Sequence, residues 1–505
     1  MPAAHQSPRR TVAPNLIDRM VGYFAPLAGL RRSVAREQLQ RAYEGASRRD
    51  GWRPSRAGAS ANTDHAMDAA ELRVRARSLV QNVPYIARAI ETLVSHTIGT
   101  GISPRSLADK PMADRVDTLW DRWVEQADAD GLGNFYSLQA RAYRAMEIDG
   151  EVLIRVRPRT AADGLAVPMQ LQLLEIDWLD SSKNGTVGGN SVVNGIEYNA
   201  LGKVSAYWIF EQHPGELIGS MRKGASRAVP ANRVIHLYRP ERPGQGRGFS
   251  RLAPVIARVR DLQLYEDAEL SRKNLESRLA VLASGDLSQL QQPEDGTGAT
   301  TPGDLGQLAS GGITAIPAGM NVTVVEPKPA PGYVEYVGQF LHLIASGLGV
   351  PYESMTGDMS GVNFSSARIR RMDFKRDVES LQWLLLVPQL CQRVRAEFYE
   401  FAALSGELPR RAWRDDWATP KWDYVNPVQD VAADAAEIAA GLSSPSEKLR
   451  QRGYKPDLVF AELKTDLDRL QADGVLPLLF AMKSGNAQAA IDLSDPYGEG
   501  KTTPK

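Results

Sequence analysis

The sequence predicts a mixed α+β fold that is predominantly helical. Apolar residues recur at helical spacing along most of the 505-residue chain. Short stretches with alternating, β-branched or aromatic residues instead gather between residues 151 and 238, separated by Gly, Asn and Pro. A chain of this length holds about three average domains. A sizeable buried core is therefore expected.

Charge and cysteine content restrict the class of protein. The 60 Lys and Arg residues balance 60 Asp and Glu residues, which argues against a free-standing nucleic-acid binder that depends on phosphate neutralisation. The single cysteine, Cys391, permits no disulfide or Cys-based zinc site within one chain, and we expect a reducing compartment. No apolar run reaches the roughly 18 residues of a membrane-spanning helix, and the first residues lack an apolar signal core. We expect neither a membrane span nor secretion.

The first half of the chain is predicted to form a basic arm followed by one α/β body. In residues 1–68 arginines outnumber acids, and one or two amphipathic helices are expected there. In the body, residues 69–249, helices at 69–96 and 113–129 are expected to pack on a sheet. The strands of that sheet are predicted at 151–156, 169–174, 196–198, 204–210 and 234–238.

The second half is predicted to contain long helices around a small lobe. Ser250 is expected to cap a helix that runs to residue 282, on the order of 50 Å. Residues 285–308 are rich in Gly, Gln, Thr and Pro, and short strands are predicted after them at 313–316 and 322–325. A second helix follows at 332–348.

A third long helix is predicted at 366–404, with a kink at 384–388 because Pro388 removes a backbone hydrogen bond. A Trp-rich connection completes a segment 366–425, and residues 426–475 are predicted to form shorter helices at 427–441 and 446–474. Residues 476–505 are polar and are expected to be disordered.

The segment between the second and third helices is the candidate binding site. Residues 356–364 form a polar loop, and the helix after it carries Arg368, Arg371 and Lys375 on one face. Cations are disfavoured near a helix N-terminus, so this placement indicates contact with an anion such as phosphate. A solvated helix face balanced by Asp373 and Asp377 is an almost equally good interpretation.

Motifs for catalysis are weak. The sequence Gly500-Lys501-Thr502 lacks the context of a phosphate-binding loop, and residues 244–248 are better explained by a tight connection than by an anion site. The six histidines have no paired zinc spacing, and acid pairs such as Asp177 and Asp180 are more typical of turns than of a Mg²⁺ site. We therefore predict no catalytic residues, no metal and no cofactor.

Several segments, taken in order, resemble one family. The chain is similar to the lambda-type bacteriophage portal proteins (head–tail connectors) over residues 15–476. No single segment is decisive, but their order and spacing together are specific. The matching segments are residues 72–79, 149–151, 194–198, 202–207, 229–231, 234–238 and 242–250.

This resemblance implies a dodecameric ring at one capsid vertex, which serves as the conduit for packaging and ejection of double-stranded DNA. It implies localisation in the virion, with host cytoplasm during assembly. Implied partners are DNA without sequence specificity, the terminase large subunit, the major capsid or scaffold protein and a head-completion or adaptor protein. The net neutrality of the chain suits a conduit, because tight phosphate contacts would resist sliding.

The resemblance also assigns parts and residues. It implies a wing (69–249), a two-helix stem (250–282 and 332–348), a clip (283–331), a tunnel loop (353–365), a kinked helix with its return to the wing (366–425) and a helical crown (426–475). The implied DNA-facing residues are Asp358, Met359, Ser360, Val362, Asn363 and Phe364, with Arg368, Arg371 and Lys375 as candidate phosphate contacts.

Two other classes stay open. A nuclease or NTPase associated with packaging is disfavoured by the missing phosphate-loop pattern and by the weak acid and histidine groups. A capsid or tail adaptor without a DNA channel is disfavoured by the order of stem, loop and kinked helix. A protein without enzymatic activity is expected.

Overall fold

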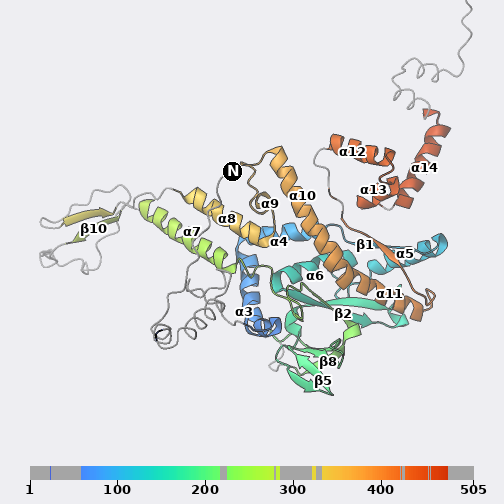
Figure 1. Ribbon diagram of the computed structural model, residues 1–505, viewed down its shortest axis with the longest axis horizontal. Coiled ribbons are helices and arrows are strands. Elements are labelled where there is room, and N and C mark those ends of the chain that lie inside the picture. Colours follow the sequence, from blue (N-terminus) through green and yellow to red (C-terminus); the bar gives the residue numbers. More distant parts are fainter. Residues whose placement is uncertain are drawn as a thin grey trace, which may run out of the picture. The chain divides into compact units, whose positions relative to one another are not determined.

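The computed structural model describes residue 23 and residues 58–216, 224–277, 280–284, 321–325, 332–420, 422, 427–452, 454 and 456–475 (Figure 1). The chain divides into two units at Ser60 and Ala61, and all elements below belong to the second unit. Most of the predicted basic arm, the predicted strand at 313–316 and the tail 476–505 lie outside the described residues. Within the described part, no helix is both long and apolar enough to span a bilayer.

The helix predicted at 69–96 is two helices, α3 (Ala61–Asn82) and α4 (Pro84–Thr97). Val83 between them is extended, with φ −114° and ψ 107°, because the ring of the following Pro84 disfavours helical backbone. Helix α3 also begins inside the predicted basic arm. Residues 61–68 therefore belong to the α/β body, which we define as residues 61–249.

Two further helices complete the body. Helix α5 (Lys110–Val124) corresponds to the prediction at 113–129, whereas α6 (Phe135–Asp149) was not predicted. The signal for α6 was present in the sequence, since Asn134 is a favourable N-cap and its side chain accepts hydrogen bonds from the N–H groups of Tyr136 and Ser137.

The predicted strands are present, but they lie in two sheets rather than one. In the first, β2 (Glu151–Pro158) is central and antiparallel to both β3 (Met169–Leu174) and β9 (Val234–Tyr238). The second is an antiparallel meander, joined to the first by the 3-10 turn Ile176–Trp178. Its strands are, in order, β4 (Gly185–Val187), β5 (Asn190–Val193), β6 (Ile196–Tyr198), β7 (Val204–Phe210) and β8 (Ser226–Pro230).

Two small antiparallel pairs were not predicted as such. Strand β1 (Ser103–Ser106) pairs with β12 (Asp415–Ala418), and β10 (Ala280–Ser284) pairs with β11 (Asn321–Val325). The predicted helix 250–282 was therefore wrong at both ends. Helix α7 covers Ile256–Ser277, its 22 residues span about 33 Å, and a turn precedes it in which Ser250 Oγ accepts the N–H of Leu252.

The later helices follow the predicted order. They are α8 (Tyr333–Leu348), α9 (Tyr352–Thr356), α10 (Phe364–Leu381), a π-helix (Gln382–Cys391) and α11 (Gln392–Leu404), then α12 (Pro427–Ala439), α13 (Pro445–Gln451) and α14 (Pro456–Ala472). The helix predicted at 446–474 is thus two helices. The predicted interruption at Pro388 takes the form of the π-helix, whose wider turn accommodates a residue without an N–H.

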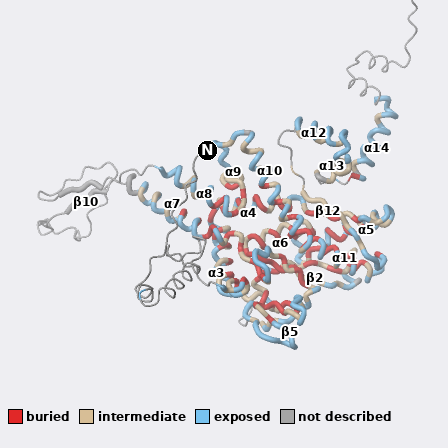
Figure 2. Tube along the Cα trace, in the orientation of Figure 1, coloured by how far each residue is buried: buried red, intermediate tan, exposed pale blue. Residues whose placement is uncertain are grey.

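One hydrophobic core joins residues from both halves of the chain (Figure 2). Trp120 and Trp123 of α5 lie against Phe398 of α11, with ring centroids 5.0 and 5.7 Å apart, and Trp123 Nε1 donates to the Met169 carbonyl of β3 at 2.9 Å. A smaller core lies between the two large sheets. The predicted mixed, mostly helical class is confirmed.

Candidate nucleic-acid interface

The candidate loop starts from a short helix that is fixed to the α/β body. Helix α9 follows Gly349, whose positive φ of 65° ends α8. The Ser354 carbonyl of α9 accepts hydrogen bonds from Arg88 Nε at 3.3 Å and Thr92 Oγ1 at 3.4 Å, both from α4. Tyr352 stacks on His342 of α8, with ring centroids 3.9 Å apart. The base of the loop is therefore held from two helices.

The loop itself, residues 357–363, is exposed apart from the half-buried Val362. Gly357 ends α9 with φ 78°, and Asp358 then shapes the turn, because its carboxylate accepts the Ser360 N–H at 2.9 Å and the Tyr352 hydroxyl at 3.3 Å. The bond from Ser360 in particular lowers the pKa of Asp358. Met359 at the tip is 65% exposed. The loop thus presents a carboxylate and an apolar side chain to solvent.

The last two predicted DNA-facing residues lie where the loop meets α10. Asn363 is the N-cap, whose side chain accepts the Ser366 N–H at 2.8 Å, while its own N–H donates to Ser366 Oγ at 3.2 Å. Phe364 is the first residue of the helix. Asp358, Met359, Ser360 and Val362 lie in the loop, so the predicted range 353–365 is too long at both ends.

The basic residues behind the loop have acidic or aromatic partners within the chain. Arg368 pairs with Asp430 of α12 at 3.4 Å, Arg370 pairs with the nearly buried Glu353 of α9, and Lys375 pairs with Glu379 at 3.5 Å. The guanidinium of Arg371 lies 5.9 Å from the centre of the Trp422 ring. Glu353 and Asp430 therefore offset the positive charge at the N-terminus of α10, which is a structural reason for arginines where the helix dipole disfavours them.

A buried charge network in the α/β body escaped sequence reasoning. Glu151 of β2 is fully buried and contacts Arg247 Nη2 at 2.7 Å, His65 Nε2 at 3.1 Å and His236 Nε2 at 3.0 Å. Burial alone would raise the pKa of Glu151, but the charge of Arg247 and the hydrogen bonds from both histidines and Arg247 hold it well below its usual value. The two histidines share this one carboxylate despite their distance in sequence.

The glycine-rich segment 244–248 is a tight connection, as predicted. A Cβ on Gly248 would lie 2.1 Å from the Gly150 carbonyl oxygen, so only glycine fits there. Arg247, next to it, is 1% exposed and is bound to Glu151 and to the Asn194 carbonyl, which it reaches at 2.8 Å. These contacts fix the chain just before α7.

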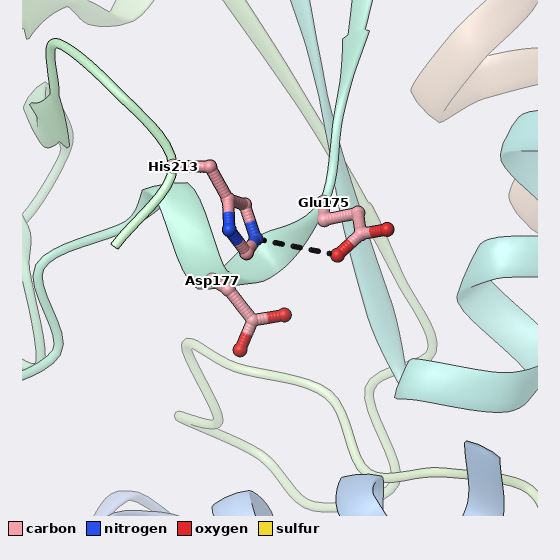
Figure 3. A group of neighbouring side chains, drawn as sticks. All are labelled: Glu175, Asp177 and His213. Atoms are coloured by element: carbon pink, nitrogen blue, oxygen red, sulfur yellow. Dashed lines mark ion pairs between the residues drawn. The ribbon is translucent and has the colours of Figure 1, made fainter. Parts of the chain in front are cut away.

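Among the described residues, Glu175, Asp177 and His213 form a group whose ligand atoms lie within 4.8 Å of one another (Figure 3). His213 Nε2 lies 3.4 Å from Glu175 Oε2. Asp177 is already paired with Arg73 at 3.0 Å and Arg77 at 2.6 Å, which supply the positive charge that a cation would bring. Asp180, which we expected to have a turn role, accepts hydrogen bonds from Ser182 and Ser226.

Comparison with known proteins identifies the family of this chain. A family model described as phage portal protein, lambda family, matches residues 45–382 of the 505, from before α3 to the start of the π-helix. The chain belongs to the lambda family of phage portal proteins. It therefore forms a ring at the portal vertex of the capsid, in the virion, and serves DNA packaging, so the predicted head–tail connector is confirmed.

Two similar curated proteins are also described as portal proteins. The probable portal protein of Halomonas phage phiHAP-1 is 27% identical, over 82% of this chain and 83% of the relative. Portal protein B of Escherichia phage lambda is 21% identical, over 81% of this chain and 85% of the relative. A chain in the virion of a native gene transfer agent particle has a TM-score of 0.44 and 17% identity, and the match covers 77% of this portal chain and 93% of that one.

Proposed function

We propose that residues 357–363 form the tunnel loop of the portal ring and face the double-stranded DNA that moves through it. The observation that carries this proposal is a short exposed loop between two fixed supports, α9 on the body and the capped start of α10. Asp358, Met359, Ser360 and Val362 form its surface. Asn363 acts by capping α10, and Phe364 begins that helix at the edge of the loop.

Arg368, Arg371 and Lys375 serve as light phosphate contacts behind the loop. Their partners inside the chain, Asp430, Trp422 and Glu379, reduce the charge available to DNA. A weak electrostatic attraction between these side chains and DNA suits this role, because every tightly bound phosphate would have to be released again as the duplex slides. Contacts to phosphate alone also require no base sequence.

The remaining parts are assigned in the same proposal. The wing is the α/β body, the stem is α7 with α8, the clip is 283–331 with the β10–β11 pair, and the crown is α12–α14. We propose a ring of twelve copies, with the terminase large subunit and then the head-completion protein at the clip, and the capsid or scaffold protein at the wing.

The proposed role is structural rather than catalytic. The group in Figure 3 has ligand chemistry, but two arginines occupy its Asp177. Magnesium-dependent DNA cleavage or ATP hydrolysis by the purified ring, abolished by Asp177→Asn, would contradict this assignment and favour the packaging enzyme.

Deletion of residues 357–362 tests the tunnel loop. It removes the exposed tip and leaves the Asn363 cap, so we expect rings of normal size by negative-stain microscopy but reduced DNA packaging or retention in particles. A control deletion of residues 162–164, an exposed turn between β2 and β3, should leave both unchanged. Failure of ring assembly would show that the loop is structural, and unimpaired packaging would remove its proposed role.

A further inference from the structure

A cavity of about 700 Å³ lies where α11, the chain that follows it and the β1–β12 pair meet. Its walls include Tyr399 of α11, Trp413 of the connection and Trp417 of β12. This volume is typical of sites that enclose a ligand of several functional groups. The proposed tunnel-loop function makes no use of it.

One wall of the cavity is aromatic. The rings of Tyr399 and Trp413 are stacked, with centroids 4.7 Å apart and an interplanar angle of 4°. The guanidinium of Arg411 lies 4.1 Å from the centre of the Trp413 ring. Because Tyr399 and Arg411 cover the faces of the Trp413 ring, an aromatic side chain that enters the cavity would meet the ring edges, at little cost in conformational freedom.

The cavity is also lined with arginines. Arg395 is 1% exposed and pairs with Asp415 at 3.1 Å and Asp117 at 3.5 Å, but its buried Nη1 has no hydrogen-bond partner among the described residues. A buried donor without a partner is costly, which favours an acceptor that arrives from outside.

The rim adds three exposed arginines. Arg411 reaches Asp109 at 3.9 Å, whereas Arg410 and Arg414 form no ion pair with any described residue. Four arginines therefore line the cavity against two carboxylates, those of Glu400 and Asp415, and Asp415 is occupied by Arg395 and the Tyr399 hydroxyl. The chemistry of the site calls for an acidic ligand with an aromatic group.

We propose that this cavity binds residues 491–499 of the same protein, from its own or a neighbouring copy in the ring. In this segment Asp492, Asp495 and Glu499 surround Tyr497, and it contains no Lys or Arg. Tyr497 enters the aromatic wall, and the carboxylates pair with Arg410, Arg411 and Arg414. This segment lies beyond the described residues.

The end of the chain can reach the cavity. Asp457, at the start of α14, contacts Arg105 of β1 at 2.5 Å, and Arg450 of α13 lies 4.0 Å from Asp416 of β12. The end of α13 and the start of α14 therefore lie beside the β1–β12 pair that borders the cavity. The 17 residues of α14 lead away by about 26 Å, and the linker 475–491 spans up to about 55 Å when extended.

Peptide binding tests the proposal with the full-length protein. The tail of the chain is first neutralised by Asp492→Asn, Asp495→Asn and Glu499→Gln, which frees the cavity for a labelled peptide of residues 489–501. We expect saturable binding, detected by fluorescence anisotropy. Arg410→Gln with Arg414→Gln should weaken it about fivefold or more, because two exposed charge pairs are lost.

Matched controls separate this site from general attraction between charges. Arg122→Gln with Arg376→Gln removes two exposed arginines elsewhere and should leave the affinity unchanged. A peptide of residues 286–296 carries the same three acids without an aromatic residue and should bind at least about fivefold more weakly. The proposal would be overturned if the two peptides bound equally or if neither bound. It would also be overturned if the Arg410 and Arg414 changes had no effect.

Amide hydrogen exchange gives a second readout in the assembled protein. If the tail occupies the cavity, its neutralisation should speed exchange at residues 409–418 in otherwise unchanged rings. Neutralisation of Asp286, Glu294 and Asp295 should not change exchange there. Identical protection at 409–418 with and without the tail acids would show that the tail is not bound.

Discussion

At the residue scale, the interactions with the largest local consequences join residues far apart in the chain. Glu151 gathers His65, His236 and Arg247 from α3, β9 and the connection before α7. Each has an ordinary local context in the sequence, so their meeting depends on the fold and could not be predicted from spacing. The basic residues behind the loop show the same limit, because Asp430, the partner of Arg368, lies 62 positions later.

The Glu151 network makes stability sensitive to acid. Burial lowers the pKa of His236, although its hydrogen bond to Glu151 and the charge of that carboxylate oppose the shift, and nearby Arg247 and His65 add to it. The unfolded chain therefore binds this proton first, and the free energy of unfolding falls as pH drops below about 6.5. The lowered pKa of Glu151 adds a further loss below the ordinary carboxylate range, as pH falls through its folded value.

We expect His236→Gln to reduce the loss of stability between pH 7 and pH 5.5, because the amide still donates to Glu151 but takes up no proton. Urea unfolding at several pH values measures the slope. His213→Gln, at a half-buried histidine outside this network, is the control. An unchanged slope in the His236 variant would assign the acid sensitivity to other groups.

At the element scale, prediction succeeded where one pattern was unambiguous. Strands β3, β6, β7 and β9 have the predicted bounds, because alternating apolar residues end at clear turns. The apolar segment of β10 continues a helical pattern equally well, and only its partner β11 selects the strand. Strand β12 is too polar to stand out, and it depends on β1, more than 300 positions earlier. The break between α3 and α4 has a local signal in the sequence, because Pro84 disfavours helical backbone at the residue before it.

The start of α10 offers a test of charge balance. In Asp430→Asn, Arg368 loses its described acidic partner, so we expect stronger, salt-sensitive association of the ring with DNA. Arg368→Gln with Arg371→Gln should weaken it, by about threefold if each arginine makes one light contact. Filter binding at 50 and 200 mM salt measures both.

The control for this test is Arg122→Gln with Arg376→Gln. It removes two positive charges, as the Arg368 and Arg371 variant does, but from other exposed positions. Opposite effects of the Asp430 and arginine variants are required by the phosphate-contact proposal. If all three variants bind DNA alike, these side chains are only structural.

At the scale of the whole molecule, residues that follow α8 complete a core begun by elements that precede α7. Val394, Phe398 and Ala402 of α11 are buried in the same cluster as residues of α4, α5 and α6. The class and the order of parts followed from the sequence and its family resemblance. The division of the strands into two large sheets could not be predicted, because the residue pattern of a strand does not show which strand pairs with it.

Assembly of the ring should depend on α14. Phe460, Leu463 and Leu467 follow one another at spacings of three and four, are 39–50% exposed and form an apolar stripe in the isolated chain. Because the family forms rings, we expect a neighbouring copy to cover this stripe. Leu463→Asp with Leu467→Asp should lower ring yield in native mass spectrometry, since each buried leucine contributes about 1.5–3 kcal/mol.

The matched control places the same charges on another face of this helix, with Ala461→Asp and Thr465→Asp. Circular dichroism should show unchanged helix content in both variants. Normal ring yield from the leucine variant would exclude α14 from the subunit interface.

The packing of α7 against α8 determines where this chain tolerates insertions during evolution. Tyr265 of α7 lies against Tyr333 and Tyr336 of α8, with ring centroids 5.9 and 4.5 Å apart, so the chain leaves and re-enters the core at adjacent points. Strands β10 and β11 repeat this pairing further out. An insertion or deletion between residues 284 and 321 therefore leaves both ends in place, and a longer loop costs little extra closure entropy. The segment between β10 and β11 can therefore diversify in length and sequence while the α/β body stays the same.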